Sequence, residues 1–441
     1  MSAAYRAPAS PLAEMPRHAA IARLCRPIAG INHILAYGQS LSSGWDGWPT
    51  LTQHSARGLL MLGHSVRPAE ESGAVWRAIG PPVLRPLAAT LQHCAETTLA
   101  PADAAGRLGG TLGETILETA LGEFQARARL PAAQLLLASS CGVGARPLAA
   151  LSFGATPDLF ARLTDCAALA RDIAAAPYAI AALLLLHGEH DNRALADGDP
   201  DGGTYLARLL ALHDDFQQRV VAGIAGQSAP AAIFIHQTGG DYASDSCSIP
   251  QAQLDAALRI PTIFLAAPTY PMPSRGGHLD PNGYRWTGAQ FGKVMHRVLT
   301  LGLDWKPLHP VRAFACGRSV HIDFHVPEPP LAFGRPFMGA ARAAVADQGF
   351  TVIDPDGGIG IAEVVLDGPR SLRLTLARAP LPGARIAYAD RHHHGRGGLH
   401  DSDPSVSTVH FVSLPDRPAP DLDGRPYALQ NWCVAFNVAL L

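Results

Sequence analysis

Short apolar runs alternate with stretches of helical periodicity from about residue 31 to residue 302. Such alternation is typical of a parallel sheet whose two faces are covered by helices. The runs that we expect to form buried strands are 31–37, 135–138, 180–186, 233–235 and 262–266. The pattern therefore predicts a doubly wound α/β fold for this part of the chain.

Four helices are predicted between and after these runs. The first carries Leu117, Ala120, Leu121, Phe124 and Ala128 on one face, the second starts with Thr156, Pro157 and Asp158, the third follows a Thr204 cap, and the fourth contains Phe291, Val294, Met295 and Val298. Each apolar face is expected to pack on the sheet.

The apolar pattern changes to a period of two after residue 306. Apolar and polar residues alternate over 320–326, 372–376 and 432–438, and turn-forming sequences separate these stretches. The alternation predicts an all-β domain, most simply a sandwich. We therefore divide the chain into an N-terminal extension (1–29), an α/β domain (30–305) and a β-sandwich accessory domain (306–441).

Composition removes several classes of protein. The chain has 35 Lys and Arg against 37 Asp and Glu, a net charge of -2, and no basic run, so a nucleic-acid partner is not expected. The longest uncharged apolar stretch, 173–186, is too short to span a membrane. A small, neutral or modestly charged substrate is the expected partner, and the sequence does not indicate an oligomeric state.

Cysteine spacing and the N-terminus bear on the cellular compartment. Seven cysteines lie far apart without a C-x-x-C pair, which argues against a disulfide framework or a structural zinc site. No apolar segment of a secretory signal is visible before residue 28. We expect a cytoplasmic protein with reduced cysteines.

The first candidate for chemistry is the loop after the first predicted strand. In an open parallel sheet, ligands bind beyond the carboxyl ends of the strands. There, Ser40 follows Gly38 and Gln39. A serine flanked by small and polar residues can expose its hydroxyl group and point its own backbone N–H at a substrate oxygen. The alternative is an ordinary serine-capped turn.

The second candidate loop contains Gly142 and Gly144 and follows the strand predicted at 135–138. Closely spaced glycines permit a near approach of backbone to ligand, and an N–H facing an oxyanion. A tight turn is the alternative. A dinucleotide-binding loop is not expected, because Pro147 stands where its third glycine would be.

The third candidate loop places four ionisable residues directly after a buried strand: His187, Glu189, His190 and Asp191. Such groups are either solvated in a crevice or satisfy one another. A metal-dependent hydrolase using His187, His190 and Asp191 is an alternative, although neither usual zinc-hydrolase spacing is present.

The fourth candidate for chemistry is a histidine. His278 lies in a glycine-rich loop ahead of the fourth helix, at the sheet edge where Ser40 is expected. Beside a nucleophilic hydroxyl, its ring can take the proton and return it to the leaving group.

The order of these motifs resembles the SGNH/GDSL hydrolases, specifically the sialate O-acetylesterase-like carbohydrate esterases. The motifs are Gly38-Gln39-Ser40, the glycine block, Gly188-Glu189-His190-Asp191, and His278-Leu279 followed by Gly283-Tyr284. The resemblance covers residues 30–302. It implies a flavodoxin-like three-layer fold and deacetylation of an esterified sugar hydroxyl, without metal or cofactor.

The resemblance also implies roles for individual residues. Ser40 would be the nucleophile and His278 the general base. The Ser40 N–H, a Gly142 or Gly144 N–H and the His187 side chain would hold the oxyanion, and Gln39 would face the substrate.

Three positions depart from the resemblance: Leu41-Ser42 replaces Asn-Met, His187 replaces Gln, and Arg275 replaces the Asp that lies three residues before the catalytic His. The last change removes the carboxylate that would orient His278. Glu189 and Asp191 are the first candidates to replace it, followed by Asp241 and Asp245; otherwise a Ser-His dyad remains.

Other functions stay open at this level. The same fold would suit a lipase or thioesterase, and Arg275 is compatible with an inactive protein that binds glycans. The His392-His393-His394 run could ligate a metal, be solvated, or reach the crevice or a glycan. Trp432 and Phe436 are expected in the sandwich core.

Overall fold

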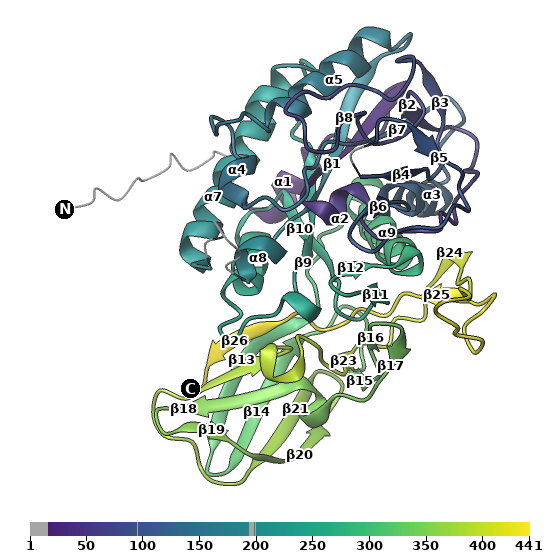
Figure 1. Cartoon of the computed structure of the whole chain (residues 1–441). Helices are drawn as coiled ribbons and strands as arrows, with labels where there is room; N and C mark the ends of the chain where they lie inside the picture. The colour runs from purple at the N-terminus through teal and green to yellow at the C-terminus, as the bar shows by residue number, and fades with distance from the viewer. Residues whose placement is uncertain (1–15, 95, 194–197, 199) are drawn as a thin grey trace.

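The computed structural model describes residues 16–94, 96–193, 198 and 200–441. Most of the N-terminal extension predicted at 1–29 lies outside the described residues; its remainder contains α1 (Arg17–Ala22). A seven-stranded sheet forms the centre of the molecule (Figure 1). Its strands, in spatial order, are β10 (Ile263–Pro268), β9 (Ala232–Gln237), β8 (Tyr178–Leu186), β1 (Ile31–Gly38), β7 (Leu135–Ser140), β2 (Leu59–Leu62) and β3 (Leu84–Pro86).

All neighbours in this sheet run parallel except β2 and β3. The five strands from β7 to β10 have the order 2-1-3-4-5 of doubly wound sheets, and β2 and β3 extend one edge. All five strands predicted from apolar runs are present. The α/β fold with a largely parallel central sheet is therefore confirmed.

Helices cover both faces of the sheet. On β1, Ile34 and Ala36 join the core under α3 (Ile116–Ala128) and α9 (Pro281–Met295). Leu35 and Tyr37 join the opposite core, which lies under the second group of helices. That group comprises α4 (Leu148–Leu151), α5 (Ala161–Ile173), α7 (Gly202–Asp215) with its extension Phe216–Ala222, and α8 (Ser248–Arg259). Burial on both faces explains why these strands are continuous apolar runs.

Two predicted helix starts are wrong. The third helix is capped by Asp201, whose carboxylate accepts the Thr204 N–H at 2.7 Å, and not by Thr204. The second helix begins at Ala161, after a bend at Thr156, and its N-cap residue Phe160 has no side-chain cap. For the third helix the sequence offers two cap-forming residues, Asp201 and Thr204, and the structure uses the first.

Two four-stranded antiparallel sheets follow residue 306. The first has the order β13 (His309–Cys316), β14 (Ser319–His325), β21 (Ser371–Leu376), β20 (Ile361–Leu366), and the second β19 (Gly357–Ile359), β18 (Phe350–Asp354), β22 (Arg385–Tyr388), β26 (Phe436–Ala439). Both contribute to one apolar core that includes Phe324, Leu374 and Phe436. Trp432 is buried in this core as expected, but the strand expected over 432–438 begins only at Phe436.

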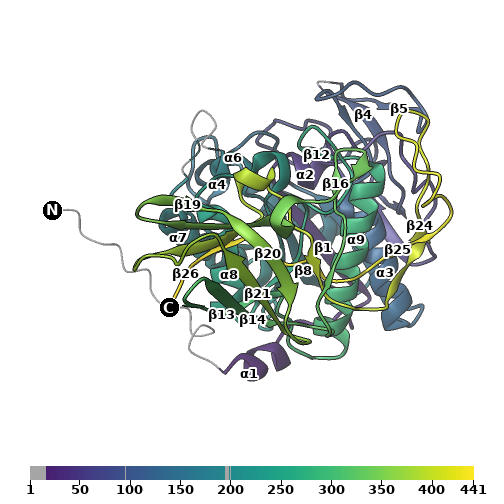
Figure 2. The ribbon, with the colours of Figure 1, turned by 90° about the horizontal axis from the view of Figure 1, so that it is seen from below.

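Between β22 and β26 of the second sheet, the chain returns to the α/β part. The ribbon of β24 (Val406–His410) and β25 (Pro426–Ala428) lies against α3 and α9 (Figure 2). Phe411 and Tyr427 belong to the same apolar core as α9. The smaller ribbons are β4 (Leu91–His93) with β5 (Leu99–Ala100) and β6 (Thr111–Leu112), β11 (Ser274–Arg275) with β12 (His278–Leu279), β15 (Ala332–Phe333) with β23 (Leu399–His400), and β16 (Phe337–Met338) with β17 (Ala341–Arg342).

No helix among the described residues is both long enough and apolar enough to cross a bilayer.

Candidate active site

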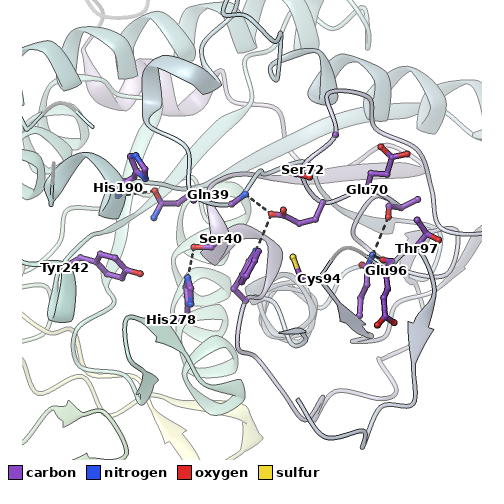
Figure 3. Close-up of a pocket in the computed structure, with 17 residues that line it drawn as sticks. Gln39, Ser40, Glu70, Ser72, Cys94, Glu96, Thr97, His190, Tyr242 and His278 are labelled. Carbon is purple, nitrogen blue, oxygen red and sulfur yellow. Dashed lines mark hydrogen bonds between the residues drawn. The ribbon is translucent and has the colours of Figure 1, made fainter. Parts of the chain in front are cut away.

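Ser40 stands at the carboxyl end of the central strand β1. It opens the single-turn helix α2 (Ser40–Ser43) directly after a sharp turn at Gly38. Gly38 has a φ of 127°, and a Cβ added there would lie 2.0 Å from the carbonyl oxygen of Leu186. Only glycine fits this approach between β1 and β8. The turn therefore fixes the Ser40 hydroxyl at the sheet edge (Figure 3).

The structure brings Ser40, His278 and Asp46 together. The Ser40 Oγ lies 2.8 Å from Nε2 of His278, and the His278 Nδ1 lies 2.8 Å from Oδ2 of Asp46. An ionised carboxylate only accepts, so Nδ1 carries the proton and Nε2 is left to accept the hydroxyl proton of Ser40. This is the hydrogen-bond chain of a serine, a general base and an orienting acid.

His278 is held on the short hairpin of β11 and β12. Asp280 caps the following helix α9 by accepting the Gly283 N–H at 2.9 Å, and Pro281 occupies the first turn. The start of a long buried helix thus anchors the histidine loop.

Asp46 is the carboxylate that sequence reasoning missed. It is 1% exposed, and its second oxygen accepts the Gly109 N–H at 2.7 Å. Its φ of 62° lies in the left-handed region, which aspartate tolerates better than most residues. The only signal in the sequence is an aspartate in a glycine-flanked turn six residues after Ser40.

Glu189 was predicted to orient His278, and this prediction is wrong. Its Oε2 accepts from Nε2 of Gln39 at 2.8 Å, and its Oε1 accepts from Nε2 of His236 at 2.6 Å. Burial alone would raise the pKa of Glu189, but the adjacent His236 holds it below the ordinary value. Glu189 therefore fixes Gln39, the residue that precedes the nucleophile, because both ring nitrogens of His278 are already engaged.

Asp191 was the second candidate to orient His278, and it too is placed elsewhere. Its Oδ2 accepts the Leu148 N–H at 2.9 Å, which ties α6 (Glu189–Asn192) to α4.

The side chain of His187 is fully buried, with Nδ1 3.1 Å from the Tyr205 hydroxyl and Nε2 3.0 Å from the Arg146 carbonyl oxygen. Burial lowers the pKa of His187. His187 thus braces the loop, and its predicted contact with the oxyanion is wrong.

The two glycines of the middle loop have different surroundings. A Cβ on Gly142 would lie 1.7 Å from the Ser42 Oγ, so this glycine permits close packing of the loop under α2. The Gly144 N–H donates to Oε1 of Glu71 at 2.7 Å, so the predicted oxyanion donor already has a partner. Gly144 lines the cavity in front of Ser40, and Gly142 is not among its described lining residues.

Arg275, which replaces the expected aspartate, has a structural position. Its guanidinium lies 3.6 Å above the ring of Trp48 and donates to Asp416 at 2.8 Å. Burial lowers the pKa of Arg275. The carboxylate that contacts His278 therefore comes from Asp46, in the loop after Ser40, and not from the position of Arg275.

The remaining candidates are not among the described residues that line the cavity in front of Ser40. Asp241 pairs with Arg396 at 3.1 Å, and Asp245 lines a separate groove beside the loop of His394. The His393 Nε2 lies 2.9 Å from the Phe350 carbonyl oxygen. Among the described residues, no group of three or more His, Cys, Asp or Glu side chains is arranged to hold a metal ion.

Ser40 and His278 open into a cavity of about 570 Å³. Figure 3 shows His190 and Tyr242 on one side of Ser40 and His278, and Cys94, Glu70, Glu96 and Thr97 on the other. Burial raises the pKa of Tyr242 to about 12, so its hydroxyl group is neutral at physiological pH. The space is sufficient for a small ligand.

Comparison with solved structures identifies the fold. A carbohydrate acetylesterase from Xanthomonas citri matches over 92% of this chain and 80% of its own, with a TM-score of 0.55 and 13% identity. This chain has the SGNH-hydrolase fold. The fold expected from the four motifs is thus shown, and the match extends over most of the C-terminal sheets as well.

Other matches cover about three fifths of this chain. An Arabidopsis thaliana protein matches 60% of this chain and 97% of its own, with a TM-score of 0.42 and 15% identity. A carbohydrate acetylesterase family member from Sinorhizobium meliloti matches 61% and 99%, with a TM-score of 0.32 and 11% identity. Both TM-scores are too low to support an inference. No family model and no curated protein matches this SGNH-fold chain.

Proposed function

We propose that this protein is a serine esterase that removes O-acetyl groups from carbohydrates. The observation that carries the proposal is the chain of two 2.8 Å hydrogen bonds from Ser40 through His278 to Asp46 at the wall of a cavity. The carbohydrate acetylesterase of the same fold supports the substrate class.

In the first half of the reaction, the Ser40 Oγ attacks the acetyl carbonyl carbon while Nε2 of His278 takes the hydroxyl proton. Asp46 keeps the ring in the reactive tautomer and stabilises its positive charge. The imidazolium then protonates the sugar oxygen, which leaves as the alcohol. An acetyl group remains on Ser40.

Two donors would stabilise the oxyanion in this mechanism. The backbone N–H of Ser40 has no hydrogen-bond partner that we identify in the described part of the chain, and the Gln39 Nε2 has a second hydrogen beyond the one given to Glu189. Donors fixed before the reaction are the largest single contribution in many acyl transfers. Gln39 thus takes the role for which His187 was predicted.

In the second half, Nε2 of His278 takes a proton from water, which attacks the acetyl-enzyme. Acetate leaves and the Ser40 hydroxyl is restored. Every proton moves through one histidine, so this scheme requires no metal and no cofactor.

Acetate release from acetylated oligosaccharides tests the proposal. Wild-type protein should release acetate, and Ser40→Ala should reduce the turnover number by about 10³-fold or more while leaving the melting temperature within a few degrees. Activity that survives in Ser40→Ala, or that a chelator abolishes, would contradict a serine mechanism.

A further inference from the structure

One wall of the catalytic cavity is acidic. Glu70, Glu71 and Glu96 line it together with Ser40, whereas no Lys or Arg side chain is among its described lining residues. The basic side chains among its described lining residues are His190 and His278. The buried Arg67 and Arg162 also interact electrostatically with Glu71, but neither lines the cavity, and the three carboxylates outnumber these two cations. The acidic wall therefore keeps a negative charge.

Glu71 is the most firmly held of the three carboxylates. Its Oε1 accepts the Gly144 N–H at 2.7 Å and the Trp45 Nε1–H at 3.2 Å. Its own backbone carbonyl accepts from Nη1 of the buried Arg162 at 2.7 Å. These three contacts fix the carboxylate at the wall before a ligand enters, so its charge acts at a defined place.

The same wall contains further features that suit a ligand. Trp45, half-buried, presents part of its indole to the cavity, and its ring centroid lies 6.0 Å from that of His278. Gln92 is 98% buried on the adjoining wall, and its Oε1 has no hydrogen-bond partner among the described residues. An aromatic face next to carboxylate and amide acceptors binds hydroxyl donors and cations, and it repels anions.

We infer that the cavity selects acetyl esters by the charge of the alcohol part, and that Glu71 sets this preference. Esters of cationic or neutral alcohols, including amino sugars and neutral sugars, enter; esters of sugars that bear a carboxylate, such as sialate, are rejected. This inference rests on the proposed esterase function and names its substrate class.

Three acetyl esters whose alcohol parts carry a permanent positive charge, no charge and a permanent negative charge test the inference. They are acetylcholine, its neutral carbon isostere 3,3-dimethylbutyl acetate, and the anion 3-acetoxypropanesulfonate. For wild-type protein, kcat/KM should fall in that order. The ratio of kcat/KM for the cationic ester to that for the anionic ester, called the span below, should be about tenfold or more and should decrease as salt is added. Glu71→Gln keeps an oxygen acceptor for Trp45 and Gly144 but removes the charge, so it should narrow the span at least about threefold.

Glu363→Gln provides the matched control, because it removes the same charge from an exposed position on β20, outside the cavity. It should leave the span unchanged. Equal kcat/KM values for the three esters, a reversed order, or an unchanged span in Glu71→Gln would overturn the inference alone. Absence of hydrolysis that depends on Ser40 for all three esters would instead overturn the proposed function, and the inference with it.

Discussion

Asp46 shows how one residue can supply a function that its neighbours in sequence do not suggest. The sequence directs attention to Glu189 and Asp191, which follow a buried strand, yet both serve as braces for loops. Asp46 reaches His278 because its backbone adopts a left-handed conformation and its second oxygen is held by Gly109. The conformation of the turn decides which carboxylate reaches His278, and that conformation could not be predicted from the sequence.

Replacing Asp46 by Asn should reduce kcat by about 10³- to 10⁴-fold, because an amide favours the wrong tautomer of His278. KM should change much less. Asp241→Asn, a rejected candidate that pairs with Arg396, serves as the control and should keep kcat within about threefold of wild type. Steady-state kinetics on an acetylated sugar measure both, and a larger loss in Asp241→Asn than in Asp46→Asn would contradict this assignment.

The meeting of Ser40 and His278 could be predicted from residue patterns, because one residue follows a strand and the other precedes a helix that the sequence itself indicates. Ser40 follows the apolar run of β1, and His278 precedes the capped start of α9. The oxyanion donors could not be predicted with the same success. Whether a donor such as Gly144 is free depends on Glu71, which lies 73 residues away in sequence.

At the level of elements, the turn between β1 and α2 positions Ser40. Gly38→Ala should lower the free energy of unfolding by about 2–4 kcal/mol, because the new Cβ would overlap the Leu186 carbonyl at a positive φ. The accompanying shift of Ser40 should also reduce kcat. Chemical denaturation and kinetics measure the two effects.

Gly383→Ala separates backbone strain from the clash at Gly38. Gly383 has a φ of 89° but nothing within 4 Å of an added Cβ. This variant should lose only about 1 kcal/mol and keep its activity. Equal losses in the two variants would show that the approach of β1 to β8 is not the constraint.

Five of the seven strands of the central sheet could be predicted, because burial on both faces leaves continuous apolar runs, whereas β2 and β3 at one edge were not predicted. Helix starts were less predictable: Asp201 and Thr204 are both good caps, and the structure uses the first. The strand at the C-terminus is shorter than its alternation suggests, since Trp432 packs in the core without belonging to β26.

At the scale of the molecule, the C-terminal part completes the core of the α/β part. Lys293 of α9 donates to Asn431 at 2.7 Å and to Asp403 at 3.0 Å. The Gln237 Nε2 at the end of β9 donates to the Ala435 carbonyl oxygen at 2.9 Å. Burial lowers the pKa of Lys293, and the Asp403 carboxylate opposes this shift. The apolar patterns of the sequence predict two domains, but they do not predict these contacts between the α/β part and the C-terminal part.

A chain ending at residue 305 should therefore fail to fold, because Lys293 and the apolar residues that contact Tyr427 would lose their partners. The full chain should unfold in a single transition by calorimetry, with both parts melting together. Two separate transitions, or a soluble and active chain of residues 1–305, would contradict this expectation.

The central claim is that Ser40 is the nucleophile activated by His278 and Asp46. Covalent labelling by a serine-directed fluorophosphonate, followed by peptide mass mapping, tests it most directly. The account predicts one modified site, at Ser40, with labelling at least about 100-fold slower in His278→Ala and absent in Ser40→Ala. Labelling at another serine, or labelling of Ser40 at the same rate without His278, would contradict it.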